Sequence, residues 1–278
     1  MSAMAQELTE ELTRAIESDQ LVLPTLPEVA LKAREAAEDP DVCAASLSKV
    51  VENDAALTAR IIKVANSPLL RGSRGVEDLK MAINRLGITF TANLITGLAM
   101  EQMFQATSDK VDKIMREVWS HSIEVAGIAH VLCRHYTKLK PEQATLAGLV
   151  HEIGVLPILT YAEHNDSLLD EDGFEDIIRA VHPKIGSTIL KYWDFPPELI
   201  DVPREFLNFE RETVGDPDYI DIVMVANLQS HLNEKHPYNE MDWSTVPAFN
   251  RLGLSTDVDS QEAEDLSTEM AEAMKLLQ

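Results

Sequence analysis

Four side chains of this 278-residue chain have the chemistry of metal ligands: His121, the adjacent pair His151 and Glu152, and His182. Imidazole nitrogens and carboxylate oxygens bind divalent metals of hard or borderline character. All four lie in stretches where apolar residues recur at the three-and-four spacing of helices. Because separate helices can bring such residues together, the sequence indicates a candidate metal site.

Each imidazole also has a purely structural interpretation. His121 shares one helical stripe with Val125 and Ile128, which places its ring on a face that should be buried. A histidine on such a face is most often a core residue whose ring is satisfied by a hydrogen bond. We give this interpretation to the remaining five histidines, which are His130, His135, His164, His231 and His236.

The neighbours of His151 and His182 add local expectations. Ala147 and Gly148 lie one turn before His151, and their small size would let another element come close to the imidazole. His182 directly precedes Pro183, and proline is favourable at the first position of a helix. We therefore expect His182 at the start of a helix.

The elements that position these residues are predicted to be helices, because strictly alternating runs typical of half-buried strands are hard to find. The expected helices cover residues 29–37, a segment beginning near 44, and residues 55–64, 76–85, 90–103, 111–136, 142–161, 183–193, 219–232 and 260–277. The predicted fold class is therefore all-α.

Composition excludes several classes of protein. With 45% hydrophobic residues the chain can form a sizeable core. It carries 47 acidic and 24 basic residues, a formal charge of −23 that would repel nucleic acid over most of the surface. We find neither an uninterrupted apolar stretch of about 20 residues nor a basic signal-like start, and we expect no membrane partner.

The two cysteines, Cys43 and Cys133, lie far apart and lack metal-ligand spacing. They are expected to be small buried thiols in a reducing compartment, and the protein is expected to be cytoplasmic.

Four motifs stand out in the N-terminal part of the chain: LPTLP at residues 23–27, VVENDAALT at 50–58, VANSP at 64–68 and AINRLG at 82–87. They resemble those of the HDOD family, the HD-related output domains of bacterial signalling proteins. The resemblance runs from about residue 20 to 230. It implies an N-terminal helical lobe packed on a lobe like that of the HD phosphohydrolases.

Three later motifs resemble the HD phosphohydrolase superfamily, which includes the HD-GYP enzymes that hydrolyse cyclic di-GMP. They are WSHS at residues 119–122, GLVHEIG at 148–154 and HPKIG at 182–186. In active relatives the middle motif is His-Asp, a later His pair supplies ligands, and a final Asp closes the site. Here Glu152 replaces the Asp, Pro203, Arg204 and Glu205 stand where the His pair would fall, and Asn227 occupies the closing position.

These departures predict a largely dismantled metal site. The extra methylene of Glu152 moves a carboxylate by about 1 Å, whereas coordination distances tolerate about 0.2 Å. The charge of Arg204 would oppose a dication, and the Gly-Tyr-Pro loop of HD-GYP enzymes is missing. We expect no catalytic residue and no bound cofactor; a retained site would use His121, His151, Glu152 and His182 to hold Mn, Fe, Zn or Mg.

The resemblance implies a non-catalytic bacterial signal-transduction module that binds a protein partner or a ligand. The alternative is a metal-dependent phosphohydrolase acting on a nucleotide or cyclic dinucleotide. A third possibility is an acidic structural protein that oligomerises through its helices. Residues 58–90 hold six basic and two acidic residues, a local excess that would suit an acidic partner or a phosphate ligand.

The expected organisation has three parts: an N-terminal helix over residues 1–19, an HDOD domain over 20–233, and an acidic C-terminal extension with a terminal helix over 234–278. The HDOD domain is expected to divide into lobes at residues 20–106 and 107–233.

Overall fold

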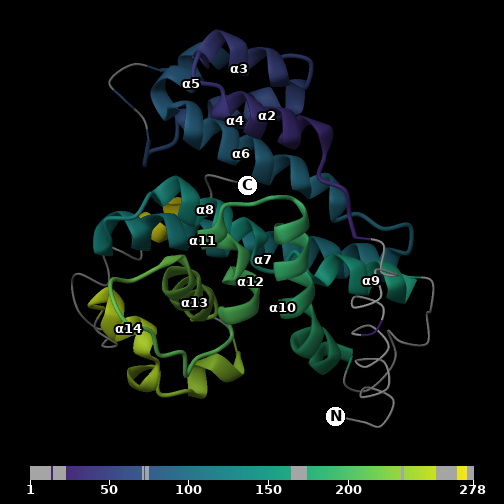
Figure 1. Cartoon of the computed structure of the whole chain (residues 1–278), viewed down its shortest axis with the longest axis vertical. Coiled ribbons are helices and arrows are strands. Elements are labelled where there is room, and N and C mark those ends of the chain that lie inside the picture. Colours follow the sequence, from purple (N-terminus) through teal and green to yellow (C-terminus); the bar gives the residue numbers. More distant parts are fainter. Residues whose placement is uncertain are drawn as a thin grey trace.

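The chain is all-α throughout the residues that the computed structural model describes, which confirms the predicted fold class (Figure 1). These residues are 14, 23–70, 72, 75–163, 174–232, 235–254 and 268–273. The expected N-terminal helix, His164 and most of the expected terminal helix lie outside them. The lobe and domain boundaries stay predictions; the one expected near residue 106 falls between two helices.

The N-terminal helices form one group in Figure 1, at the top of the view. They are α2 (Glu28–Glu38), α3 (Ala44–Val51), α4 (Ala55–Ala65), α5 (Leu79–Leu86) and α6 (Ile88–Met100). Asp54 begins α4 by accepting a hydrogen bond from the Leu57 backbone N–H at 2.9 Å. Helix α6 packs against both α2 and α8, so it joins this group to the rest of the molecule.

Helix α5 begins three residues later than predicted. The Asn66 side chain accepts from the Val76 backbone N–H and donates to its carbonyl, both at 2.8 Å, which holds Val76 outside the helix. Asp78 then caps α5 through the Met81 N–H at 2.8 Å.

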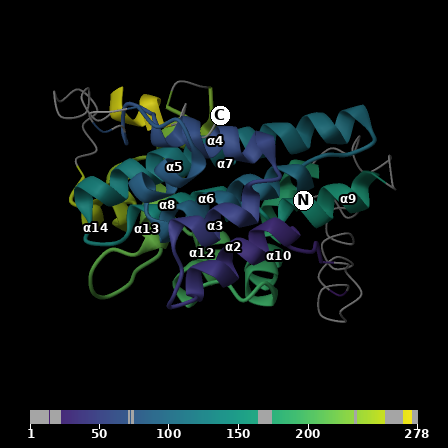
Figure 2. The same cartoon turned by 90° about the horizontal axis from the view of Figure 1, so that it is seen from above.

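The remaining helices lie below the N-terminal group in Figure 1, and Figure 2 shows the same arrangement from above. They are α7 (Asp109–Tyr136), α8 (Pro141–Val150), α9 (Val155–Glu163), α10 (Phe174–Tyr192), α11 (Pro197–Ile200), α12 (Val202–Glu205), α13 (Tyr219–Ser230) and α14 (Pro247–Leu252), with the short 3-10 helices η1 (Glu101–Met103), η3 (Pro237–Glu240) and η4 (Trp243–Thr245). Helices α7, α8 and α13 pack against one another.

The prediction of one continuous helix over residues 142–161 is wrong. Helix α8 ends at Val150, a turn occupies residues 151–154, and α9 begins at Val155. In a continuous helix, Pro157 could not donate the backbone hydrogen bond that its position requires. In the observed structure Pro157 lies in the first turn of α9, where no such donor is needed.

The prediction that Pro183 begins a helix is also wrong. Helix α10 begins nine residues earlier, at Phe174, and contains Pro183, so His182 lies within the helix. A buried stripe that includes Ile177, Val181 and Ile185 runs past the proline. Its burial stabilises the helix despite the backbone hydrogen bond that the proline removes.

One stretch of the described residues, Pro141–Glu163, is long and apolar enough to cross a membrane by length and composition. His151 and Glu152 interrupt it, and 83% of its most apolar window is buried inside the structure. Such burial is typical of core helices in globular domains.

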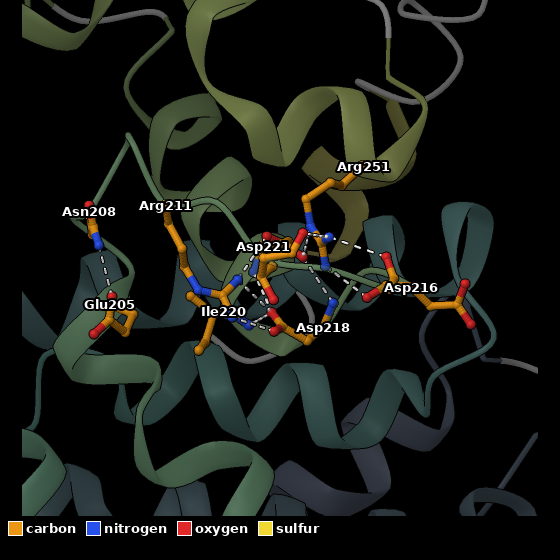
Figure 3. Close-up of polar contacts among 10 residues, drawn as sticks. Glu205, Asn208, Arg211, Asp216, Asp218, Ile220, Asp221 and Arg251 are labelled. Atoms are coloured by element: carbon orange, nitrogen blue, oxygen red, sulfur yellow. Dashed lines mark hydrogen bonds and ion pairs between the residues drawn. The ribbon is translucent and has the colours of Figure 1, made fainter.

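A buried charge network holds the segment after the main helices (Figure 3). Asp221, on the first turn of α13, is 1% exposed and pairs with Arg211 at 3.0 Å and with Arg251 of α14 at 2.9 Å. Arg251 also donates to the backbone carbonyls of Thr213 and Asp216 at 2.9 and 2.8 Å. Helix α14 is therefore tied to the start of α13.

Both cysteines are free thiols, and Cys133 is buried as predicted, whereas the prediction of burial is wrong for Cys43, which is exposed. Burial raises the pKa of the Cys133 thiol to about 11, so it is protonated at neutral pH.

Candidate functional site

Three of the predicted ligands meet in space. The candidate ligand atoms of His121, His151 and Glu152 all lie within 4.8 Å of one another. His121 comes from the middle of α7, His151 follows the last residue of α8, and Glu152 lies in the turn before α9. We call these three residues the triad.

Close packing of α7 on α8 brings the triad together. A Cβ on Gly148 would lie 2.5 Å from the Ala126 Cα, so only glycine allows this approach. His121 lies on the same helix as Ala126, and His151 follows Gly148 by three residues. The small residue before His151 has the role expected from the sequence.

A backbone hydrogen bond orients His151. Its Nδ1 lies 2.7 Å from the Gly148 carbonyl oxygen, so Nδ1 carries the proton and donates. The Nε2 atom is buried and has no hydrogen-bond partner among the described residues. Burial, and then the neighbouring His121, hold the pKa of His151 well below its usual value, so the ring is neutral and Nε2 offers a lone pair.

His121 is bound by Asn227, the residue predicted to stand where active relatives have the closing Asp. The His121 Nε2 lies 3.0 Å from the Asn227 Oδ1 on α13, so the imidazole donates to the amide oxygen. Because the amide is neutral, Asn227 adds no negative charge to the site.

Glu152 supplies the only carboxylate of the triad. Burial raises its pKa to about 7, so protonation of the carboxyl group competes with ionisation near neutral pH. A protonated carboxyl group is a poor metal ligand, and a bound cation would have to displace that proton.

His182 is the fourth predicted ligand and lies outside the triad. It is 2% exposed, and its Nδ1 has no hydrogen-bond partner among the described residues. Burial, with a smaller contribution from Arg179, lowers its pKa to about 3, so the ring is neutral.

These residues open onto a cavity of about 300 Å³. Two triad residues, His121 and Glu152, line it. The other lining residues are Glu117, Val118, Glu175, Ile178, Arg179, His182, Phe206, Leu207, Asn227, His231, His236 and Tyr238.

The core interpretation of His231 and His236 is wrong, because both line this cavity. The two rings stack 3.9 Å apart, and the His231 ring also stacks on His121 at 4.9 Å. Tyr238 packs against His236 at 4.3 Å. A sequence signal was available, since both histidines stand among polar residues instead of on an apolar stripe.

Two other histidines allow the same test. His130 is buried and its Nδ1 lies 2.9 Å from the Thr145 hydroxyl, which confirms the core interpretation. For His135 that interpretation is wrong, because its side chain is 43% exposed and pairs with Glu269 at 2.8 Å.

The expectation that Arg204 places positive charge in the site is also wrong. Arg204 is exposed, pairs with Asp201 at 3.7 Å, and does not line the cavity. The segment instead contributes Phe206, whose ring packs edge-on against His151 at 4.8 Å. The cavity receives its positive charge from Arg179, which sequence reasoning missed.

The described residues fit one metal ion better than two. The unpartnered Nε2 of His151, the imidazole of His121 and the Glu152 carboxylate are a donor set for a single borderline divalent ion. Two ions would need carboxylates to bridge and neutralise them. Glu152 alone does not meet that need, and Asn227 contributes no charge.

Comparison with known proteins places this geometry in context. The HDOD domain family matches residues 23–206. A crystal structure from Shewanella amazonensis SB2B, of a protein named as a candidate metal-dependent phosphohydrolase, is 30% identical and covers 100% of both chains with a TM-score of 0.87. An HDOD domain protein of unknown function from Geobacter sulfurreducens is 23% identical over 98% of this chain and 97% of that one, with a TM-score of 0.68.

Two further proteins resemble the chain more distantly. A candidate signal transduction protein from Marinobacter aquaeolei VT8 is 21% identical over 93% of this chain and 60% of that one, with a TM-score of 0.60. An uncharacterized protein of Treponema pallidum (strain Nichols) is 24% identical over 243 residues, 82% of this chain and 46% of that protein. The chain thus spans about half the length of this curated relative.

Proposed function

Because this chain belongs to the HDOD domain family, we propose that it is a non-catalytic bacterial signal-transduction module whose central cavity binds a ligand or takes part in binding a protein partner. One observation carries the proposal: the site has a single carboxylate among its candidate ligands, and the neutral Asn227 binds His121 where an acid would be needed. Two-metal hydrolysis depends on carboxylates that bridge and neutralise the ions.

The packing around His151 supports the same function. The aromatic ring of Phe206 lies 4.8 Å from the His151 ring and 5.8 Å from the His182 ring. An apolar side chain therefore stands beside both imidazoles, and it can offer no ligand to a second ion. Tight packing of this kind suits a structural or ligand-binding cavity.

A second candidate function is a metal-dependent phosphohydrolase that uses one ion. It is favoured by the buried, unpartnered Nε2 of His151 and by the convergence of His121 and Glu152. A divalent ion, when bound, would supply Lewis acidity and lower the pKa of a coordinated water. The name of the Shewanella protein points in the same direction for that protein.

Elemental analysis and a hydrolysis assay separate the two functions. Protein purified without chelator or metal-affinity tag is analysed for Mn, Fe, Zn and Mg, and is then assayed on a generic phosphodiester with added manganese. We expect well under one metal per chain and no turnover above that of His151→Ala. The exposed His135→Ala is the matched control, because His135 lies outside the cavity.

About one metal per chain, with turnover that is lost in His151→Ala and kept in His135→Ala, would establish the phosphohydrolase and remove the non-catalytic proposal. Each variant is checked for folding by its thermal unfolding transition.

We further propose that the protein is cytoplasmic. For the basic region at residues 58–90, we propose an acidic or phosphate-bearing partner. Lys63 and Lys80 are exposed in this region. Two other members are occupied within the chain, since Arg60 pairs with Glu101 and Arg85 donates to the Ala65 carbonyl at 2.9 Å. The net charge of −23 makes nucleic acid an unfavourable partner.

A further inference from the structure

Arg179 brings a fixed positive charge to the cavity from α10. Its guanidinium lies 6.0 Å from the centroid of the Tyr238 ring, and it forms no ion pair with any described residue. Glu175 lies one turn before it on the same helix without pairing with it. The guanidinium is therefore available to an anion that enters the cavity.

His182 places a second unused polar group beside this charge. It follows Arg179 by three residues, so both side chains lie on one face of α10 and both line the cavity. The ring is 2% exposed and its Nδ1 lacks a partner among the described residues. A buried polar atom without a partner is unfavourable, and a ligand that hydrogen-bonds to it would relieve this cost.

The charge at this end of the cavity favours an anion over a cation. Arg179 would repel a dication held by His182, in agreement with the position of His182 outside the triad. The other acids do not reverse this preference. Glu117 pairs with Lys113 at 3.7 Å, Glu175 is exposed to solvent, and Glu152 belongs to the triad.

We propose that Arg179 and His182 form a binding subsite for the oxyanion group, phosphate or carboxylate, of a small-molecule ligand. A guanidinium binds such groups through two parallel N–H donors, and a neutral imidazole can add one more hydrogen bond. This inference rests on the proposed ligand-binding function and names the chemistry of the ligand.

The rest of the ligand would contact other residues that line the cavity. Among these, His231, His236 and Tyr238 follow the family-matched region, which ends at residue 206. A cavity of about 300 Å³ has room for a small molecule larger than the oxyanion alone.

Thermal unfolding of the full chain tests the subsite with inorganic phosphate and with acetate, each against chloride at equal ionic strength. At least one oxyanion is expected to raise the melting temperature of the wild type. Arg179→Gln is expected to weaken that binding at least about tenfold. Arg179→Lys should weaken it by less, because lysine keeps the positive charge but lacks the two parallel N–H donors of the guanidinium. Arg204→Gln is the matched control, since Arg204 is exposed and outside the cavity.

Protection by phosphate alone or by acetate alone supports the subsite and identifies the group. No protection of the wild type by either anion, or equal protection of Arg179→Gln, would overturn it. The outcome is separable from that of the proposed function. A wild type that carries metal and hydrolyses phosphodiester removes the non-catalytic proposal, whereas the anion dependence on Arg179 is measured without turnover.

Discussion

At the scale of single residues, Gly154 decides how closely α10 approaches the turn that carries His151 and Glu152. A Cβ at this position would lie 2.0 Å from the His182 carbonyl oxygen and 2.5 Å from the Gly186 nitrogen. Both atoms belong to the backbone, so neither can rotate away. The absence of a side chain at Gly154 is therefore a condition for placing His182 next to the triad.

Gly154→Ala is expected to destabilise the protein by about 1 to 3 kcal/mol, because the turn and α10 must separate to admit the methyl group. Gly75→Ala is the control: a Cβ at Gly75 meets nothing within 4 Å, and its effect should stay within about 0.5 kcal/mol. Urea unfolding of both variants measures the difference. Equal stability of the two variants would show that the close approach is not needed.

At the scale of elements, the start of α13 anchors the C-terminal segment. Asp218 accepts hydrogen bonds from the N–H groups of Ile220 and Asp221 at 3.0 and 3.1 Å, and Asp221 returns one by accepting from the Asp218 N–H at 3.0 Å. The same Asp221 binds Arg211 and Arg251, as Figure 3 shows. Helix α13 also carries Asn227 and leads into His231, so this anchor supports one wall of the cavity.

Asp221→Asn is expected to cost on the order of 3 kcal/mol, because two guanidiniums would face one another without the buried carboxylate between them. Lys32→Gln is the control, since the Lys32–Glu28 pair is 57% and 79% exposed and solvent screens it. Chemical denaturation of both variants compares the costs. A loss in Asp221→Asn no larger than in Lys32→Gln would show that the network does not stabilise the fold.

At the scale of the whole molecule, the N-terminal helices hold the end of α10. The Trp193 indole N–H donates to the Pro24 carbonyl at 2.9 Å, so the LPTLP motif contacts the residue that follows α10. Arg34 of α2 donates to the Trp193 carbonyl at 2.7 Å and to that of Asp194, and lies 4.6 Å from the Phe195 ring. Two segments more than 150 residues apart in the sequence thus fix the helix that carries Arg179 and His182.

Arg34→Gln is expected to lower stability by about 1 to 3 kcal/mol, because two charge-assisted hydrogen bonds and a cation–π contact are lost. Relative to the wild type, hydrogen–deuterium exchange should become faster in the last turn of α10. Exchange in α3, which Arg34 does not hold, should stay unchanged and serves as the internal reference. Arg116→Gln is the control, because Arg116 is 66% exposed and pairs with its helical neighbour Asp112. Unchanged exchange at the end of α10 in Arg34→Gln would exclude this coupling.

The sequence by itself determined the helical class and most helix positions, and it offered four candidate ligands that include the triad. The helices depend on local physics: apolar periodicity marks them, and side chains such as Asp54 begin them. The HDOD motifs added the family, which the match over residues 23–206 confirms.

Only the tertiary structure decided which polar residues share the cavity. His121 and Asn227 meet although 106 residues separate them, and they share the cavity with Arg179 of α10 and with His231 and His236, which lie just outside helical spans. The tertiary structure also showed that His182 lies inside α10 and that α8 ends at Val150. Periodicity reports which face of a helix is buried, whereas the partner of that face depends on packing between distant segments, which local sequence does not encode.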